Sequence, residues 1–295
     1  MFNNDFLTDL ARERVVPFLG AGVSASASID GRPAYLDWKN FLLSVAETRA
    51  ENLRDQIKNL IESNDFLLAC QLLQDECRDD WQTFLANEYG KEAEPSELHR
   101  AILALSQRLI VTTNFDKLIE TAWPTTKEKF LGGRSLKVLS FVDQTVFKCL
   151  KDFETPYLIK LHGSIDIPEK LIFSLESYIK MAFGNERYSS FFESVLINYT
   201  VLFIGFSMRD PAILSLMETY AHKYPHARPH YILSSQSQPE NIRVINMKFR
   251  KLIAIEYQDD NNHEALPRIL SELRHGANQK RRELVAQMSN SSLNP

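Results

Sequence analysis

The sequence has few cysteines, no excess of basic residues and no long apolar run, and each absence excludes a class of protein. Its three cysteines, Cys70, Cys77 and Cys149, are odd in number and match no metal-ligand spacing, which excludes a disulfide scaffold or a four-cysteine zinc site. Cys70 and Cys77 lie two helical turns apart among apolar residues, so we expect both to be buried free thiols. We predict no bound metal.

Two further absences concern partners and location. Lys and Arg number 34 against 38 Asp and Glu, and this net charge of −4 gives no electrostatic signature of a nucleic-acid binder. No apolar stretch approaches the roughly 18 residues that a transmembrane helix needs. The N-terminus has neither the basic nor the apolar region of a secretory signal. We therefore expect a cytoplasmic protein that binds neither membranes nor nucleic acid directly.

What the sequence does contain is a series of short, compact apolar runs separated by segments with a helical period. The 295 residues are 44% hydrophobic, which is enough for a sizeable core. Runs of this length, bounded by glycine or polar residues, are typical of strands buried in a parallel sheet. We predict an α/β fold, a Rossmann-like doubly wound parallel sheet. The predicted strands are 15–19, 109–112, 157–161, 201–204, 231–233 and 252–255.

One interval breaks the alternation of strands and helices. From Asp37 to about Glu94 the pattern is helical throughout, with Asp37 and either Asn64 or Asp65 placed to cap helices. We predict a helical insertion between the first and second strands. The expected division is a Rossmann-like domain of residues 1–36 and 95–295 and an inserted helical subdomain of residues 37–94.

A glycine-rich turn, Gly20-Ala21-Gly22-Val23-Ser24-Ala25, follows the first predicted strand. It fits the G-x-G-x-x-G/A pattern, in which glycines allow a tight turn and a close approach of the backbone to a diphosphate. A plain turn without a ligand is the alternative. The acidic residue that usually follows about 20 positions later at the end of a second strand is missing, so this is not an ordinary dehydrogenase half-site.

Polar or small residues also end three other predicted strands. They are Thr112-Thr113-Asn114-Phe115-Asp116, His162-Gly163-Ser164 and Gly205-Phe206-Ser207. Each alone can be a helix cap or a turn, and His162 alone can be a core histidine. Because ligands of open α/β sheets gather at the carboxyl ends of strands, four such ends together predict a binding site.

These motifs, in this order, resemble those of the sirtuin family and its bacterial sirtuin-like branch. The glycine-rich NAD loop of the family is matched by Gly20-Ala21-Gly22-Val23-Ser24, and its T-x-N-x-D motif by Thr112, Asn114 and Asp116. Its catalytic histidine-glycine pair is matched by His162-Gly163. The later loop, which meets the adenosine half of NAD, resembles Gly205-Phe206-Ser207. Thr113 stands where a glutamine is usual. The four zinc-binding cysteines of sirtuin deacylases are missing, and only Pro33-Ala34-Tyr35 remains of a P-D-F-R element.

Because it lacks the zinc module and has a helical insertion, the chain resembles the sirtuin-like effectors of antiphage defence that hydrolyse NAD. The resemblance implies that the chain cleaves NAD to nicotinamide and ADP-ribose. His162 would accept a proton from a ribose hydroxyl, Asn114 would orient a water, and Asp116 would bind the nicotinamide carboxamide. NAD contacts are further expected from Gly20, Ala21, Gly22, Ser24, Thr113, Gly205, Phe206 and Ser207. Arg32 would neutralise phosphate, unless it is simply exposed.

Two other functions are compatible with the sequence. The chain could be a non-catalytic sensor or scaffold that binds NAD or ADP-ribose, or an NAD-dependent protein deacylase. For a hydrolase, activity must be gated, and the family implies a partner in trans such as a HerA-type hexameric translocase ATPase. The helical insertion and the amphipathic C-terminal helix are the expected assembly surfaces of a homo-oligomer.

Overall fold

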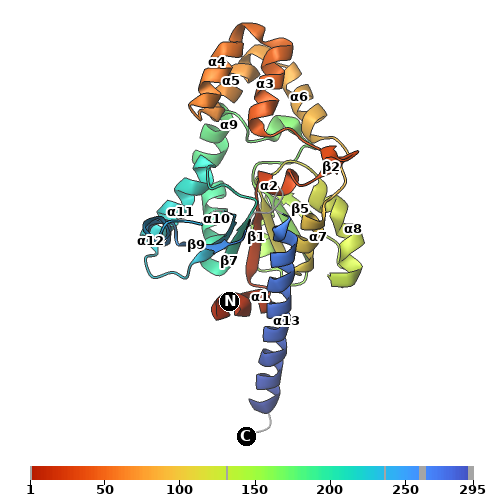
Figure 1. Ribbon diagram of the computed structural model, residues 1–295, viewed down its shortest axis with the longest axis vertical. Coiled ribbons are helices and arrows are strands. Elements are labelled where there is room, and N and C mark those ends of the chain that lie inside the picture. The colour runs from red at the N-terminus through yellow and green to blue at the C-terminus, as the bar shows by residue number, and fades with distance from the viewer. Residues whose placement is uncertain (1, 131, 236, 259–263, 292–295) are drawn as a thin grey trace.

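Seven parallel strands form one sheet at the centre of the molecule (Figure 1). The structure is a computed structural model that describes residues 2–130, 132–235, 237–258 and 264–291. The sheet order is β5-β6-β4-β1-β7-β8-β9, so the chain places β4, β5 and β6 on one side of β1 and then crosses to the other side for β7, β8 and β9. The strands are β1 (Val15–Leu19), β4 (Leu109–Thr112), β5 (Lys137–Ser140), β6 (Tyr157–Lys160), β7 (Thr200–Ile204), β8 (His230–Ser234) and β9 (Leu252–Glu256).

The predicted doubly wound α/β fold is therefore confirmed, and all six predicted strands are present. The prediction missed β5, because this edge strand is half-exposed and its Lys-Val-Leu-Ser sequence is not a continuous apolar run. It also missed a short hairpin of β2 (Ser28–Ile29) and β3 (Arg32–Pro33), which lies after the glycine turn.

Helices cover both faces of the sheet and divide the buried core into two layers. One face packs against α10 (Glu186–Asn198) and α11 (Pro211–Lys223), and its core includes Phe18, Phe192 and Phe203. The other packs against four helices and includes Phe6 and Trp123. These four are α1 (Asn4–Ala11), α7 (Glu97–Ala104), α8 (Leu118–Phe130) and α13 (Ala265–Ser291).

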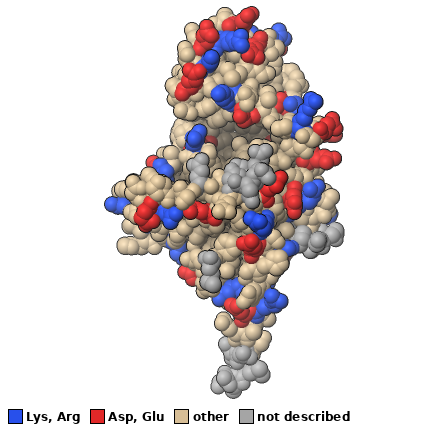
Figure 2. Space-filling model, viewed as in Figure 1, with Lys and Arg blue, Asp and Glu red and all other residues tan. Residues whose placement is uncertain are grey.

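The remaining helical segments connect these elements. They are α2 (Ala21–Ser24), the 3-10 turns η2 (Val146–Leu150) and η3 (Pro168–Lys170), α9 (Leu175–Ser177), the π-helical turn η4 (Tyr178–Phe183) and α12 (Glu240–Arg250). Within the described residues, no helix is both long and apolar enough to span a bilayer. On the face drawn in Figure 2, acidic and basic side chains are interspersed and neither sign dominates.

The interval between residues 37 and 94 is helical, as predicted. It consists of α3 (Trp38–Arg49), η1 (Glu51–Leu53), α4 (Arg54–Glu62), α5 (Phe66–Cys77) and α6 (Asp80–Tyr89), which form the group at the top of Figure 1. Asp37 caps α3 by accepting from the Asn40 amide at 2.7 Å, and Asp65 caps α5 by accepting from the Leu68 amide at 3.3 Å. Treating this segment as a separate subdomain stays a prediction.

The helical group has its own core, and all three cysteines are free. Cys70 is buried in this core, where the indole of Trp38 donates to its sulfur at 2.9 Å. Cys149 is buried beneath the sheet. The prediction that Cys77 is buried was wrong: its side chain is half-buried, because it lies in the last turn of α5 beyond the tightly packed part of the group.

Phe173 joins the helical group to the body of the molecule. It follows the turn after β6, and its ring contacts five aromatic rings at centroid distances of 5.2–6.1 Å. Four of them belong to the helical group and one to the segment after β4: Trp38, Phe41, Trp81, Tyr89 and Phe115. This aromatic cluster holds the helices over the carboxyl edge of the sheet.

Replacing Phe173 by Ala is expected to destabilise the protein by about 3–5 kcal/mol, because it leaves a cavity among these rings. Phe153→Ala is the matched control, since Phe153 is 74% exposed and its loss is expected to change stability by less than about 0.5 kcal/mol. Urea unfolding of both variants measures the difference, and equal midpoints would contradict this role of Phe173.

Candidate active site

The four strand ends that carry the predicted motifs are neighbours in the sheet. The strand order β6-β4-β1-β7 brings them together, and the pairing register sets Lys160, Thr112, Leu19 and Ile204 at one level. Asn114 and His162 each lie two residues beyond this level, just after the ends of the adjacent strands β4 and β6. Sheet topology therefore gathers residues from distant parts of the chain along one edge.

The glycine turn after β1 lies directly against the turn after β7. The Gly20 amide donates to the carbonyl of Ile204 at 3.0 Å, and the Gly22 amide donates to that of Gly205 at 2.9 Å. A Cβ at Gly22 would lie 2.9 Å from the Gly205 Cα, and one at Gly205 would lie 2.6 Å from the Val23 nitrogen. The close approach that these glycines permit is thus between two protein backbones, and the Gly22 amide is already engaged.

The segment after β4 is tied to the same turn. The Asn114 side-chain amide donates to the Gly20 carbonyl at 2.8 Å, and the Asn114 backbone amide donates to the Thr112 hydroxyl at 3.0 Å. The Asp116 carboxylate accepts from the Ser24 hydroxyl and, at 3.0 Å, from the Leu118 amide at the start of α8. Asp116 therefore both caps the helix and faces the glycine turn. A role as a helix cap is thus compatible with a role as a site residue.

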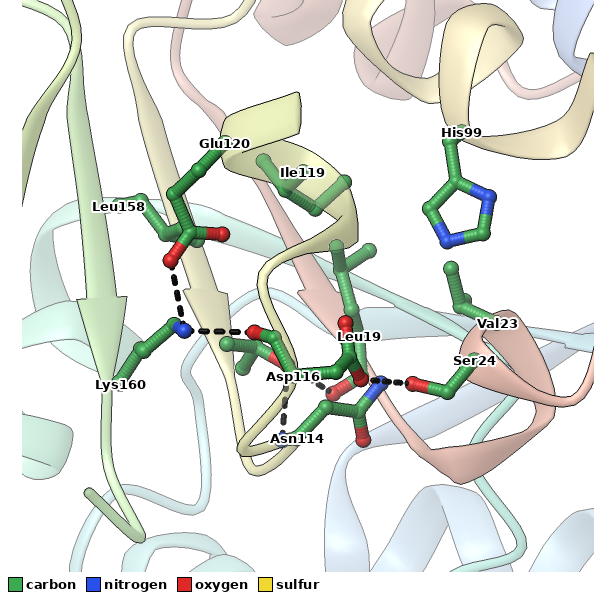
Figure 3. A pocket seen from close by; sticks show the side chains of 11 residues that line it. Leu19, Val23, Ser24, His99, Asn114, Asp116, Ile119, Glu120, Leu158 and Lys160 are labelled. Atoms are coloured by element: carbon green, nitrogen blue, oxygen red, sulfur yellow. Dashed lines mark hydrogen bonds and ion pairs between the residues drawn. The ribbon is translucent and has the colours of Figure 1, made fainter. Parts of the chain in front are cut away.

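A pocket lies between the glycine turn and the start of α8 (Figure 3). Its cavity volume is only about 10 Å³, about the room that one water molecule needs and far below the roughly 300–1,000 Å³ typical of ligand pockets. Three predicted site residues line it, Ser24, Asn114 and Asp116. The other lining residues are Leu19, Val23, His99, Thr112, Ile119, Glu120, Leu158 and Lys160.

Lys160, Glu120 and His99 were not predicted to belong to this pocket. Lys160 is 1% exposed and its ammonium lies 2.6 Å from Glu120 Oε1. It also donates to the backbone carbonyls of Asp116 at 2.6 Å and Phe115 at 3.2 Å. One signal could have found it: Lys160 is the single charged residue in an otherwise apolar strand, where a buried charge needs partners.

His99 has a structural role at the start of α7. It is the third residue of α7, and its Nδ1 accepts from the Ser96 amide at 3.1 Å in a capping box. The imidazole is also buried against the pocket, and this burial lowers its pKa to about 4. In Figure 3 its ring faces Val23 and Ser24.

His162 lies at the same edge but in a different layer from this pocket. It is 3% exposed, and its Nε2 is 3.0 Å from the Tyr188 hydroxyl and 3.6 Å from Asp210 Oδ2. Tyr178 donates to the same Asp210 oxygen at 2.6 Å. Burial lowers the pKa of His162, while the nearby Asp210 carboxylate opposes this shift. The imidazole is therefore neutral at pH 7.

Among the residues that the structure describes, His162 is not in the lining of the pocket. Its neighbours Tyr178 and Tyr188 belong to the core on the α10 face, whereas Leu19, Ile119 and other lining residues belong to the core on the α7 and α8 face. The edge of the sheet joins the two. A ligand that contacts both Asn114 and His162 must cross this edge between β4 and β6.

The other predicted contacts lie around the same edge. Ala21 and Ser207 are exposed, and Thr113 is half-buried, with its amide donating to the Leu19 carbonyl at 3.2 Å. Phe206 packs edge-on against Phe18 at 5.2 Å. Arg32 is exposed on the β2–β3 hairpin. Their contacts with a ligand stay predictions.

Within the described part of the chain, no group of three or more His, Cys, Asp or Glu residues is arranged to hold a metal ion. The polar side chains gathered at this edge include the imidazoles of His99 and His162, the carboxamide of Asn114, the carboxylates of Asp116 and Glu120 and the buried ammonium of Lys160.

A family model described as a SIR2-like domain matches residues 108–278. The chain is 24% identical over 242 residues to "NAD(+) hydrolase ThsA" of Bacillus cereus (strain MSX-D12), covering 81% of this chain and 46% of that protein. It is 27% identical over 209 residues to the protein of that name from Cytobacillus dafuensis, covering 70% of this chain and 38% of that protein.

A third relative is "Defense-associated sirtuin 2" of Bacillus subtilis, 23% identical over 273 residues, which are 89% of this chain and 25% of that protein. The chain thus spans less than half the length of these curated relatives.

The contact between the turns after β1 and β7 predicts how adding one methyl group at Gly205 changes stability. Gly205→Ala is expected to destabilise the protein by more than about 2 kcal/mol and to separate the turns, because Gly205 has φ +60° and its Cβ would meet backbone at 2.6 Å. Gly31→Ala is the control: its φ is +76°, but no atom lies within 4 Å of its Cβ, so only the backbone cost of about 1–2 kcal/mol applies. Thermal unfolding of both variants measures the difference; equal losses would contradict the contact.

The buried histidines predict how stability depends on pH. Burial lowers the pKa of His99 to about 4 and that of His230 to about 3, and it also lowers that of His162. Because the unfolded chain takes up these protons below pH about 6.5 and the folded chain does not, each histidine is expected to lower stability by up to about 1.4 kcal/mol per pH unit below that value.

Unfolding midpoints measured from pH 7 to 5 should fall, and His230→Gln should reduce the slope. Asn59→Gln, at an exposed position and without a titratable group, should leave the slope unchanged. If His230→Gln leaves the pH dependence of the unfolding midpoint unchanged, buried His230 is not a cause of the loss of stability at low pH.

Proposed function

The chain belongs to the SIR2-like family, whose domain model matches more than half of it, and we propose that it hydrolyses NAD to nicotinamide and ADP-ribose. The observation that carries the proposal is the convergence of four motif-bearing strand ends on one edge of the sheet. The names of its ThsA relatives, NAD(+) hydrolases, support the substrate and the reaction. We also propose a role in antiphage defence, and the name of the Bacillus subtilis relative, "Defense-associated sirtuin 2", supports a role in defence.

The reaction breaks the bond between ribose C1′ and the pyridinium nitrogen. The bonding electron pair goes to that nitrogen, so the leaving nicotinamide becomes neutral and positive charge develops on the ribose. Water then bonds to C1′ and releases a proton. The leaving group needs no acid, so the protein contributes by holding the dinucleotide and by stabilising charge on the sugar.

We assign each side chain a role in this reaction, and its position supports the assignment. The pocket lined by Ser24, Asn114 and Asp116 would hold the nicotinamide end, with Asn114 orienting the water. His162, neutral because it is buried, would accept a proton from a ribose hydroxyl. Asp210 and Tyr188 would fix its ring. In this arrangement the ribose lies across the edge between β4 and β6.

We also propose that the activity is gated. The pocket is smaller than a typical ligand pocket, and the side chains of Asn114 and Ser24 are bonded to Gly20 and Asp116. A dinucleotide can enter only after these contacts rearrange. A partner that acts in trans, of the HerA type or another, is our proposed cause of this change.

A homo-oligomer is a further proposal, and the shape of α13 supports it. The first half of this helix packs on α1 and α7 through residues such as Leu270 and Leu273. Its second half extends past the body and leaves Val285 59% and Met288 69% exposed (Figure 1). Exposed apolar side chains on such an extension favour assembly.

The proposal predicts the activity of two variants. His162→Ala and Asn114→Ala are each expected to lower kcat/KM for NAD by at least about 100-fold, since each removes a group that acts on the reacting sugar. Chromatography of nicotinamide and ADP-ribose measures this, both with purified protein and in cells that express it.

His222→Ala and Asn59→Ala are the matched controls, because both residues are exposed. Full activity in His162→Ala and Asn114→Ala would reject the site. Binding of NAD with no product under any condition would favour a sensor or scaffold. Formation of O-acyl-ADP-ribose that depends on an acylated peptide would favour a deacylase.

A further inference from the structure

One carboxylate oxygen in the pocket lacks a donor. Glu120 is the third residue of α8, and its Oε1 lies 2.6 Å from the Lys160 ammonium. Its Oε2 is buried and has no hydrogen-bond partner in the described part of the chain. A buried acceptor without a donor is costly, and at the wall of a pocket it marks a place where a ligand can supply the donor.

The neighbouring polar groups of the pocket are already engaged. Asp116 accepts from Ser24 with one oxygen and from the Leu118 amide with the other. Asn114 donates its side-chain amide to Gly20. Glu120 Oε2 is therefore the carboxylate oxygen of the pocket that still lacks a donor.

The orientation of Glu120 is fixed by a fully buried cation. Besides Glu120, Lys160 binds the carbonyls of Phe115 and Asp116, so it holds the carboxylate and the segment after β4 in one arrangement (Figure 3). A group held in this way can recognise a ligand without first losing conformational freedom.

The charges around this oxygen determine what it can accept. Two carboxylates, Asp116 and Glu120, face the pocket, and one ammonium, that of Lys160, lies beside them. The remaining charge is negative. A neutral N–H donor is attracted to such a place, whereas a carboxylate is repelled by like charge in a poorly solvated pocket.

We propose that Glu120 is a specificity-determining residue: beside Asp116, it accepts one of the two N–H groups of the carboxamide of the leaving ring, and it excludes dinucleotides that carry a carboxylate there. This inference rests on the proposed function of the pocket. It adds a residue that the four motifs do not contain, and it restricts the substrate to the amide form of the dinucleotide.

The test compares NAD with nicotinic acid adenine dinucleotide, which differs only in bearing a carboxylate. Binding of both to the wild-type protein and to Glu120→Gln is measured by calorimetry, together with kcat/KM from the released base. The wild-type protein is expected to prefer NAD by at least about 100-fold. Glu120→Gln removes the charge and adds a donor, so it should lower this ratio at least about tenfold.

Glu97→Gln is the matched control, because Glu97 lies in the first turn of α7 and is exposed; it should leave the ratio unchanged. Glu120→Asp keeps the charge but shortens the side chain, so it should weaken NAD binding while the acid form stays excluded. It also tests the proposal if Glu120→Gln fails to fold.

Equal binding of the two dinucleotides by the wild-type protein, or a binding ratio that Glu120→Gln changes by less than twofold, would overturn the inference. The binding ratio is independent of turnover. A wild-type protein that binds NAD selectively through Glu120 but releases no nicotinamide would therefore support this inference and reject the proposed hydrolysis.

Discussion

The contact between two bare backbones at Gly22 and Gly205 is the constraint on which the rest of the site depends. The amide of Gly22 donates to the carbonyl of Gly205, and neither position leaves room for a Cβ. This contact holds the turn after β1 against the turn after β7. Asn114 then reaches Gly20, and Ser24 at the end of α2 reaches Asp116. Without the close approach, the segment after β4 would lose two of its anchors.

The site is divided by the sheet edge, and its two parts differ in their ionisable groups. On the α7 and α8 side, two carboxylates and one buried ammonium surround a small pocket. On the α10 side, His162 lies among tyrosines, and burial keeps its imidazole neutral despite the nearby Asp210 carboxylate. A neutral base beside a negatively charged pocket suits a substrate whose positive charge moves from a ring to a sugar during the reaction.

The buried pair of Lys160 and Glu120 is better explained by function than by stability. Burying two charges costs about as much as their attraction returns, so such a pair is weak evidence for stabilisation. Burial raises the pKa of Glu120, and Lys160 opposes this shift. What the pair achieves is position: Lys160 connects β6 to the segment after β4 and leaves one oxygen of Glu120 facing the pocket.

The amino-acid sequence by itself determined the strands and the chemistry at their ends, because a buried parallel strand appears as a short apolar run and its end as small or polar residues. Val15–Leu19 followed by Gly20 is such a case, and Asp37 as a helix cap is another. The exposed edge strand β5 gave no such signal. Tertiary structure alone decided that four strand ends are neighbours, that Gly22 faces Gly205, and that Glu120, Lys160 and His99 share a pocket. These contacts join residues that are far apart in the chain. A local sequence pattern does not determine which of these distant residues come together when the chain packs.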